Sequence, residues 1–377
     1  MRVSLILVLW ALVTNTYSCQ QDTKAPVNTS TTSTTPSLET MIGQMIMVGV
    51  KGMNEEDISP AFLKQIDQGY IGGIVLFDYD VTTKKAYRNI ESPAQVKKLI
   101  SDLKSHASIP LLMAVDQEGG KVNRLKAKYG FPNSVTAKYL GTLDNIDSTK
   151  YYAIQNAETL KSLGFNVNFS PVVDVDLNPA NPVIGKYERS YSDKSEIVIK
   201  HATAWIKEQD AQGILSTLKH FPGHGSSDAD SHEGITDVTK YWSEEELAPF
   251  KAVSALDYQI AIMTAHVQNN QLDSIFPATL SEKVIHKILR KDWQFDGLVF
   301  SDDLQMKAVN AIYDFEIILQ KSIEAGVDVL VFGNNIEYDE TIPARAVKAI
   351  AKMVEEGTIS RERIELSYGR IVQVKGG

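Results

Sequence analysis

The sequence predicts an α/β fold in which eight parallel strands close into a single (β/α)8 barrel of the TIM type. Short apolar runs rich in valine and isoleucine alternate with longer amphipathic segments, which is typical of βα units around a parallel sheet. About eight such runs follow one another, as a closed barrel requires. Polar residues stand at or just past the ends of different runs, and they converge on one mouth only if the sheet closes. An open doubly wound sheet is the alternative.

The elements follow from these patterns in chain order. The expected strands are residues 44–50, 73–77, 110–115, 166–173, 214–218, 259–265, 297–301 and 328–332. The expected helices are residues 61–68, 93–106, 149–163, 194–212, 243–256, 281–291, 306–325 and 342–356. Ser243 and Ser281 support two helix starts, because a serine hydroxyl and the glutamates after it stabilise the N-terminus of a helix. The polar residues at the strand ends are Asp116, Asp174, Lys219, His220, His266, Asp302 and Asn334.

Composition excludes several classes of partner. The 377 residues are 43% hydrophobic and 23% charged, as in ordinary globular proteins. A net charge of −9 argues against nucleic acid and anionic membrane surfaces, which need clustered lysine and arginine. No glycine-rich nucleotide-binding motif follows the first strand or occurs elsewhere, so no nucleotide cofactor is expected.

The N-terminus predicts export. Residues 1–18 combine Arg2 with an apolar run that is too short to span a membrane, which is typical of a signal peptide. Cys19, the only cysteine, follows directly and is the predicted site of lipid attachment; a chance cysteine beside an ordinary cleavage site is the alternative. Residues 19–38 are rich in serine and threonine and predict a flexible tether. The catalytic domain would then span residues 39–377, exported and held to a bacterial membrane by lipid alone, facing the periplasm or the cell surface.

One loop concentrates titratable side chains. Pro222, Gly223 and Gly225 prevent a helix after the expected strand 214–218, so the surrounding histidines and aspartates lie on a loop at its carboxyl end. Within this loop, His232 can exchange a proton near neutral pH, and Asp230 could orient its ring. The two residues form a candidate proton-transfer pair. The alternative interpretation is that both are ordinary solvated residues of a loop.

A second candidate group follows the strand 297–301. Asp302 and Asp303 are adjacent carboxylates at the end of this strand, and one of them can be held at the barrel rim as a nucleophile, a base or a metal ligand. For Asp303 the favoured interpretation is capping of a helix that begins near Leu304.

A zinc site is the competing interpretation of the histidines. His220 and His224 have the i, i+4 spacing of helical zinc motifs, but Pro222 and Gly223 between them remove the helical geometry. No metal site is therefore predicted.

Three separate segments together resemble the signature segments of family 3 glycoside hydrolases, with the bacterial β-N-acetylhexosaminidases as the most similar branch. They are Lys219–Gly225 with Asp230-Ser231-His232, Asp116-Gln117-Glu118-Gly119-Gly120-Lys121-Val122-Asn123-Arg124, and Ser301-Asp302-Asp303-Leu304. The resemblance extends from about Met41 to Gly333. It implies a (β/α)8 barrel that hydrolyses terminal β-linked N-acetylglucosamine from peptidoglycan fragments or other amino-sugar glycans, with retention of configuration.

The resemblance also implies roles for single residues. Asp302 matches the nucleophile that forms the glycosyl-enzyme intermediate, and His232 matches the acid/base residue on a mobile loop, with Asp230 as its partner. Asp174 matches a barrel-core position. The positions that bind the sugar hydroxyls match Asp116, Arg124, Arg189, Lys219 and His220.

Two departures from the family pattern stand out. Lys121 replaces an arginine, which removes a forked donor, so no substrate contact is expected of it. The stretch Gly185–Tyr191 is slightly longer than usual, which affects the placement of Arg189.

Other activities remain open at this level. A β-glucosidase, a β-xylosidase or a phosphorolytic enzyme of the same family would share these segments. A carbohydrate-binding lipoprotein without activity is the non-enzymatic alternative, and the joint presence of Asp302, His232 and Asp230 argues against it.

Overall fold

The computed structural model describes residues 36–230 and 234–376. The predicted signal peptide, Cys19, most of the predicted tether and His232 therefore lie outside the described residues. Within the described part, no helix combines the length and the apolar character that crossing a membrane requires.

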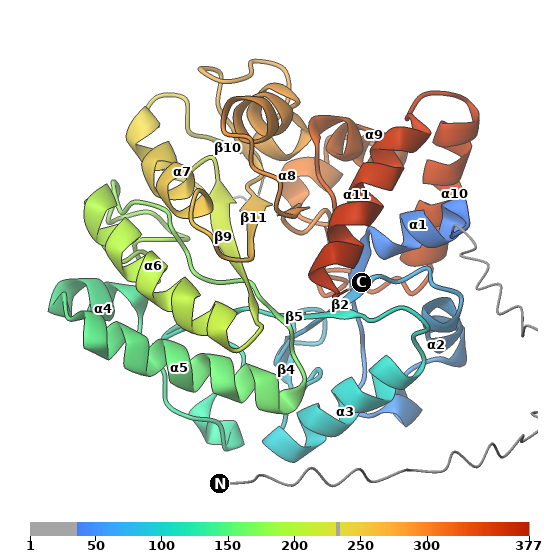
Figure 1. Cartoon of the computed structure of the whole chain (residues 1–377), viewed down its shortest axis with the longest axis horizontal. Helices are drawn as coiled ribbons and strands as arrows, with labels where there is room; N and C mark the ends of the chain where they lie inside the picture. Colours follow the sequence, from blue (N-terminus) through green and yellow to red (C-terminus); the bar gives the residue numbers. More distant parts are fainter. Residues whose placement is uncertain (1–35, 231–233, 377) are drawn as a thin grey trace, which may run out of the picture. The chain divides into compact units, whose positions relative to one another are not determined.

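Eight parallel strands form one sheet in the order β13-β11-β9-β8-β5-β2-β1-β14. A bridge between Phe300 and Val329 joins the two outer strands, so the sheet is a nearly closed barrel (Figure 1). At this seam, Ser301 N donates to Val329 O and Ser301 Oγ accepts from Val331 N. The strands are β1 (Ile46–Gly49), β2 (Gly73–Leu76), β5 (Leu112–Val115), β8 (Val167–Asn168), β9 (Leu215–Phe221), β11 (Ile260–Thr264), β13 (Val299–Phe300) and β14 (Leu330–Phe332).

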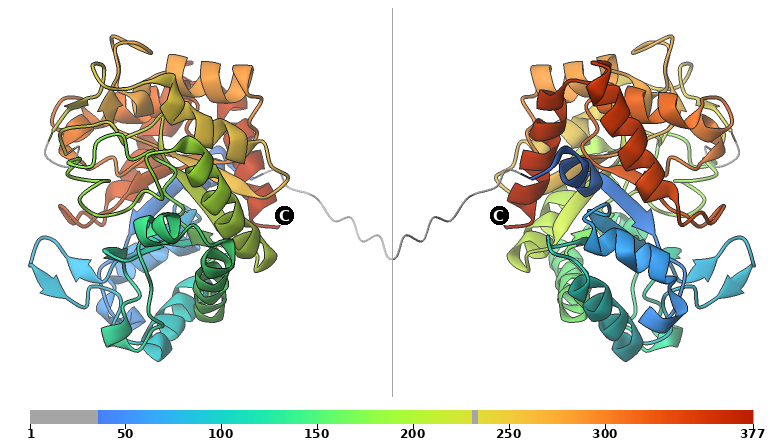
Figure 2. Two further views of the ribbon diagram at one scale, coloured as in Figure 1. Left: turned by 90° about the vertical axis from the view of Figure 1, so that its left-hand side faces the viewer. Right: turned by 90° about the vertical axis from the view of Figure 1, so that its right-hand side faces the viewer.

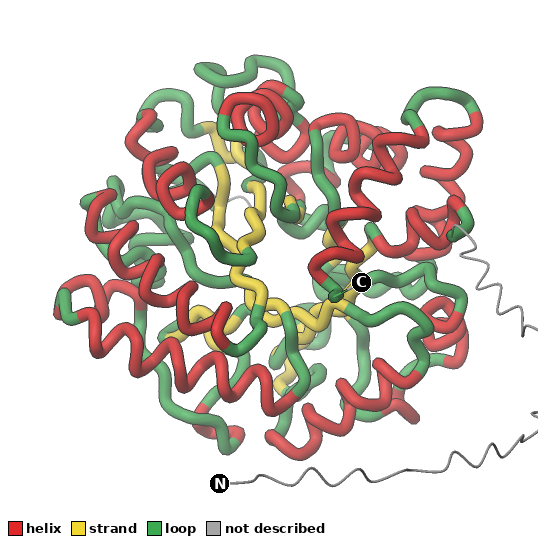
Figure 3. Tube along the Cα trace, viewed as in Figure 1, coloured by secondary structure: helices red, strands yellow, loops and turns green. Residues whose placement is uncertain are grey.

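Helices surround the strands, as the tube in Figure 3 and the two further views in Figure 2 show. The α-helices are α1 (Leu38–Gln44), α2 (Pro60–Asp67), α3 (Pro93–Ser105), α4 (Ala137–Leu143), α5 (Ile146–Leu163), α6 (Ser195–Ala211), α7 (Ala248–Ser254), α8 (Lys307–Asn310), α9 (Phe315–Ala325), α10 (Ile342–Glu355) and α11 (Arg361–Val374). The other helical segments are η1 (Glu55–Asp57), η2 (Ala127–Tyr129), η3 (Glu244–Leu247), η4 (Ala278–Leu280) and the π-helix η5 (Lys283–Asp292). Short strand pairs on the loops are β3 (Tyr79–Asp80) with β4 (Lys85–Ala86), β6 (Gln117–Gly119) with β7 (Val122–Asn123), and β10 (Thr236–Asp237) with β12 (Val267–Gln268).

All eight predicted strands are confirmed, and the barrel architecture with them. The predicted helix 306–325 is wrong as one helix, because α8 ends at Asn310 and α9 begins after Asp314. Gln44, which was expected to open the first strand, ends α1 instead. Helices α1, α4 and α11 were not predicted.

Burial on both faces explains why the strands are continuous apolar runs. Every residue of β1, β2, β5 and β14 is buried, since one face packs inside the barrel and the other against helices. Gly49 shows how closely the barrel is packed at β1. A Cβ atom there would lie 1.9 Å from Gly333 O, so any other residue would push the loop after β14 away.

Candidate active site

A cavity of about 390 Å³ opens at the carboxyl ends of the strands. Every strand of the sheet except β1 contributes a lining residue, either from the strand or from one of the two positions that follow it. All predicted site residues within the described chain line this cavity. They are Asp116, Arg124, Arg189, Lys219, His220, Asp230 and Asp302.

Not every polar residue at a strand end reaches the cavity. His266 and Asn334 are buried and hold the backbone of neighbouring loops: His266 Nε2 lies 3.0 Å from Asp303 O, and Asn334 Nδ2 donates to Gly49 O. The expectation that the whole ring of polar residues converges on the mouth is therefore wrong for these two, because their side chains satisfy buried backbone groups instead. It is also wrong for Asp174, which is fully buried and does not line the cavity.

A buried network of charges forms one wall of the cavity. Lys219, on β9, donates to Asp116 Oδ1 at 2.8 Å and lies 2.7 Å from Glu118 Oε1. Arg189 binds Glu118 through two parallel hydrogen bonds, Nε to Oε2 at 2.8 Å and Nη2 to Oε1 at 2.7 Å. This forked geometry fixes both side chains. The network therefore presents preorganised donors and acceptors, which suit the hydroxyl groups of a polar ligand.

The cations of the network keep its acids ionised. Burial alone would raise the pKa of Glu118, but Arg189 and Lys219 outweigh it and lower this pKa to about 2. Burial likewise opposes ionisation of Asp116, yet Lys219 and Arg124 lower the pKa of Asp116 below its usual value. Both side chains are therefore hydrogen-bond acceptors at neutral pH.

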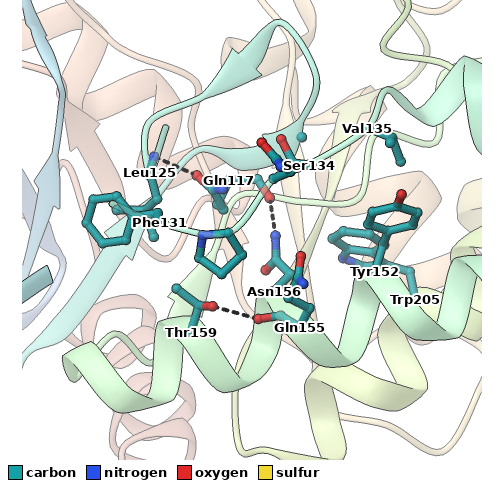
Figure 4. A pocket seen from close by; sticks show the side chains of 13 residues that line it. Gln117, Leu125, Phe131, Ser134, Val135, Tyr152, Gln155, Asn156, Thr159 and Trp205 are labelled. Carbon is teal, nitrogen blue, oxygen red and sulfur yellow. Dashed lines mark hydrogen bonds between the residues drawn. The ribbon is translucent and has the colours of Figure 1, made fainter. Parts of the chain in front are cut away.

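The β6–β7 hairpin positions Arg124. Gln117 Oε1 accepts from the backbone N–H groups of Arg124, at 3.1 Å, and Leu125, at 2.9 Å. The carbonyl of Gln117 in turn accepts from Asn156 Nδ2 on α5 at 3.0 Å, and Figure 4 shows Gln117 between Leu125 and Asn156. Residues around Gln117 line a second cavity of about 20 Å³, which has room for about one water molecule and none for a sugar. Gln117 is thus a support for the hairpin.

Asp174 organises the backbone of the histidine-containing loop. This fully buried carboxylate accepts from the backbone N–H groups of His220 and His224, and its Oδ2 lies 2.7 Å from His220 Nδ1. His220 Nε2 lies 3.1 Å from Arg189 Nη2, and an arginine can only donate, so His220 carries its proton on Nδ1. Asp174 therefore acts as a core residue, in agreement with the role that the sequence suggested.

His224 also lines the cavity, although the sequence indicated no role for it beyond the rejected zinc site. Burial and the neighbouring His220 lower the pKa of His224 to about 4. Its ring is neutral at physiological pH, and Nδ1 lies 2.8 Å from Ser227 Oγ. Among the residues that the structure describes, no three His, Cys, Asp or Glu side chains are arranged to hold a metal ion.

Asp302 and Asp303 have different surroundings. Asp302 follows β13, lines the cavity, and its Oδ1 accepts from Asp303 N at 2.8 Å. Asp303 Oδ1 accepts from Gln305 N at 3.0 Å and from Gly333 N at 2.9 Å, so it joins the loops after β13 and β14. The predicted capping by Asp303 is therefore only partly right, since it captures a nearby N–H group but the helix begins later, at Lys307.

The loop from Pro222 to Asp230 rests on Glu246, which the sequence placed only among the glutamates that follow Ser243 at a helix start. Glu246 is fully buried, and its Oε2 accepts from Gly225 N at 2.9 Å and from Ser226 N at 3.3 Å. Glu246 Oε1 is buried without a hydrogen-bond partner in the described chain. Burial raises the pKa of Glu246 to about 7. Asp230, at the end of this loop, lines the cavity.

The residues missed by sequence reasoning share one property. Each of them binds a partner from another part of the chain; they are Glu118, Gln117 and Glu246. Glu118 belongs to the segment Asp116–Arg124, but no role was predicted for it. Its position between Asp116 and Arg124, two predicted sugar-binding residues, could have indicated that Glu118 belongs to the site. Nothing local pointed to Glu246.

A comparison with protein families matches residues 37–374 to the glycosyl hydrolase family 3 N terminal domain. Among curated proteins, a beta-hexosaminidase A of Pseudoalteromonas piscicida is 32% identical over 343 residues, and a beta-hexosaminidase of Haemophilus influenzae is 33% identical over 300 residues. These matches cover 84% and 78% of this chain. The chain spans 55% of the first relative's length and 80% of the second's.

Solved structures agree with the fold. A family 3 beta-N-acetylglucosaminidase from Paenibacillus sp. str. FPU-7 superposes with a TM-score of 0.82 at 34% identity, covering 91% of this chain and 62% of that protein. A beta-N-acetylhexosaminidase from Beutenbergia cavernae has a TM-score of 0.79 at 27% identity, covering 91% of this chain and 99% of the other.

Proposed function

Because this chain belongs to glycoside hydrolase family 3, we propose that it is an exo-acting, retaining β-N-acetylglucosaminidase. The observation that carries the proposal is the shared cavity: Asp302 lines the same 390 Å³ space as the network of Asp116, Lys219 and Arg124. This volume lies within the range of about 300–1,000 Å³ that is usual for small-molecule sites. The terminal N-acetylglucosamine would occupy it.

The reaction is a double displacement. A carboxylate oxygen of Asp302 attacks the anomeric carbon while the bond from this carbon to the glycosidic oxygen breaks, and His232 gives its proton to the departing oxygen. In the second step His232 removes a proton from water, and the water oxygen displaces Asp302 from the anomeric carbon. Two inversions at one carbon restore the β configuration.

The acid in this reaction is an imidazole. Most glycosidases use a second carboxylic acid, whose pKa must be raised for the task. An imidazole has a suitable pKa in water, so a loop residue can serve without burial. Asp230, two residues before His232, lines the cavity and would orient the ring.

Substrate recognition is assigned to the charged wall. Asp116 accepts hydrogen bonds from sugar hydroxyls, whereas Lys219, Arg124 and Arg189 donate them, and Glu118 holds Arg189 and Lys219 in place. Because each of these groups already has an ion-pair partner, the wall binds a neutral sugar without leaving a buried charge unpaired.

The test compares 4-nitrophenyl β-glycosides of N-acetylglucosamine, glucose and xylose, with and without phosphate. We expect turnover of the N-acetylglucosaminide alone, without phosphate dependence, and NMR should detect the β-anomer of the released sugar first. Initial formation of the α-anomer would exclude the double displacement. A sugar 1-phosphate product would establish the phosphorolytic alternative, and binding of chitooligosaccharides without cleavage would favour the carbohydrate-binding lipoprotein.

We also propose peptidoglycan fragments as natural substrates and lipid attachment of the exported protein at Cys19. The support for lipid attachment is the short apolar segment before Cys19 and the serine- and threonine-rich stretch after it. The support for the substrate is the resemblance of the sequence to bacterial β-N-acetylhexosaminidases. Labelling of bacterial cultures with a radioactive fatty acid should mark the protein and leave Cys19→Ala unmarked. Mass spectrometry of products from defined muropeptides and chitooligosaccharides tests the substrate.

A further inference from the structure

Tyr187 stands out among the residues of the cavity because it is also exposed. Its side chain lines the same space as Asp302, yet 48% of Tyr187 is accessible to solvent. A residue with both properties lies at the mouth. A tyrosine ring in such a position offers an apolar face together with a polar end, which suits a ligand of mixed character.

The backbone holds Tyr187 in place from both sides. Lys186 N donates to Asn181 O, and Lys186 O accepts from Lys121 Nζ at 2.8 Å. On the other side, Glu188 N donates to Gly185 O and Glu188 O accepts from Lys138 N, with Glu188 in the left-handed region at φ 58°. The next residue, Arg189, is fixed by Glu118. The ring of Tyr187 is thus presented by a rigid loop.

The charges around the ring are partly compensated. Lys121 Nζ lies 4.0 Å from Glu188 Oε1, which leaves Lys186 as the remaining charge next to Tyr187 on this loop. Such a surface favours a neutral ring with an apolar face and hydroxyl groups at its edge more than a strongly charged group. A pyranose has this character.

We infer that Tyr187 is a specificity-determining residue, whose ring binds the pyranose on the leaving-group side of the scissile bond. This inference rests on the proposed function. The terminal sugar enters the cavity, where Asp302 and the buried charged wall contact it. The sugar linked to this terminal unit then projects from the mouth, and Tyr187 is positioned to stack against it. Because the loop is already fixed, little ordering cost opposes this contact.

The test compares a substrate that has a second pyranose with one that lacks it. We would measure kcat and KM for N,N′-diacetylchitobiose and for methyl N-acetyl-β-glucosaminide, together with the inhibition constant of free N-acetylglucosamine. The variants are Tyr187→Ala and Tyr187→Phe. The control is Tyr139→Ala, which removes an equally exposed tyrosine (51%) from α4, outside the lining of the cavity.

We expect Tyr187→Ala to lower kcat/KM for the disaccharide about tenfold, mainly through KM, as loss of one aromatic contact predicts. The methyl glycoside and inhibition by N-acetylglucosamine should not change, Tyr187→Phe should retain most of the activity, and Tyr139→Ala should behave as the unmodified protein. Equal losses on both substrates, with weaker inhibition, would assign the ring to the terminal sugar. Unchanged kinetics would make it an ordinary surface residue. Either result overturns the inference.

A failed proposed function would look different, since the unmodified protein would then cleave neither substrate. Calorimetric titration with the uncleaved disaccharide and with N-acetylglucosamine would in that case test Tyr187 directly. The inference requires Tyr187→Ala to weaken only the disaccharide. Equal weakening, or no binding of either sugar to the unmodified protein, would reject it.

Discussion

The two ends of the barrel each bury a network of acids and cations, and they use it differently. At the amino end, Asp328 precedes β14 and contacts three arginines, among them Arg290 from η5 and Arg363 from α11. Further N–H groups of Arg290 and Arg363 bind backbone carbonyls, such as Phe295 O and Val327 O. At the carboxyl end, Asp116 and Lys219 form a similar pair beside a cavity.

The difference lies in what remains accessible. Asp328 is fully buried and also accepts from Val299 N on β13, so this network joins helices to the sheet. The side chain of Asp116 keeps 19% of its surface exposed toward the cavity. Buried charge alone therefore does not identify a site; the useful signal is buried charge next to space for a ligand. Four changes test this contrast, in order of decreasing effect.

Replacement of the proposed nucleophile should affect function alone. We expect Asp302→Asn to lower kcat by roughly 10⁴-fold or more, as losses of catalytic nucleophiles generally do. The midpoint of urea unfolding should hardly change, because the amide can still accept from Asp303 N. Asp228→Asn, which removes an exposed acid near the same mouth, is the control. An active Asp302→Asn enzyme would remove the nucleophile assignment.

Removal of Asp328 should affect stability alone. Asp328→Ala removes the fully buried carboxylate that three partly buried arginines share, and breaking such a pair costs about 3–5 kcal/mol. Urea unfolding should detect this loss, while kcat of the remaining folded enzyme stays normal. Asp296→Asn serves as the control, since Asp296 contacts Arg370 from an exposed position. If Asp328→Ala changed kcat with little effect on unfolding, the two ends would not be separate.

Glu118 should make the stability of the carboxyl end depend on acid pH. Its pKa is about 2 in the folded protein and near its ordinary value of 4.5 in the unfolded chain, so its contribution is complete above pH 4.5 and declines as the pH falls toward 2. Between pH 5 and pH 2, the unmodified protein should lose about 3 kcal/mol more than Glu118→Gln. Urea unfolding across this range provides the measurement. If the free energies of unfolding of the unmodified protein and of Glu118→Gln changed in parallel with pH, the ion pairs of Glu118 with Arg189 and Lys219 would be contradicted.

Glu246 should show the opposite dependence with a smaller effect. Its pKa is raised to about 7 on folding, so its contribution is complete below pH 4.5 and is lost as the pH rises through 7. From pH 5 to pH 7 the unmodified protein should lose about 2 kcal/mol relative to Glu246→Gln. Thermal unfolding at several pH values would detect the difference, with the exposed Glu244→Gln as the control. A Glu246→Gln profile that follows the unmodified one would indicate an ordinary pKa.

The sequence predicted the barrel well because most of its strands, such as β1, β2, β5 and β14, are buried on both faces and therefore read as apolar runs. The sequence did not predict the gap between α8 and α9. The helical pattern continues through Asn310 and Asp314, although α8 ends at the first and α9 begins after the second. Helix α11 has a start signal in the sequence, because Ser360 Oγ accepts from Arg363 N, but it lies beyond the eight strand–helix units that a barrel requires.

The sequence predicted which single motifs belong to the site, but not which residues of different motifs contact each other. Asp116, Lys219 and Asp302 follow or end strands, and strand ends of a barrel meet at one mouth. The partner of Arg189, in contrast, depends on how the loop of residues 177–190 folds against the β6–β7 hairpin. Such contacts join segments distant in the chain, so no local pattern encodes the pairing of Glu118 with Arg189.

The seam between β13 and β14 has a consequence for the order in which the enzyme becomes active. Asp302 stands directly after Ser301, whose backbone N–H binds Val329, just before the last strand, and whose hydroxyl binds Val331 within it. During synthesis, the residues proposed for catalysis all leave the ribosome before this strand does. A growing chain would then contain all the proposed catalytic residues before the strand that aligns Asp302. Catalysis would start only when this last strand closes the sheet.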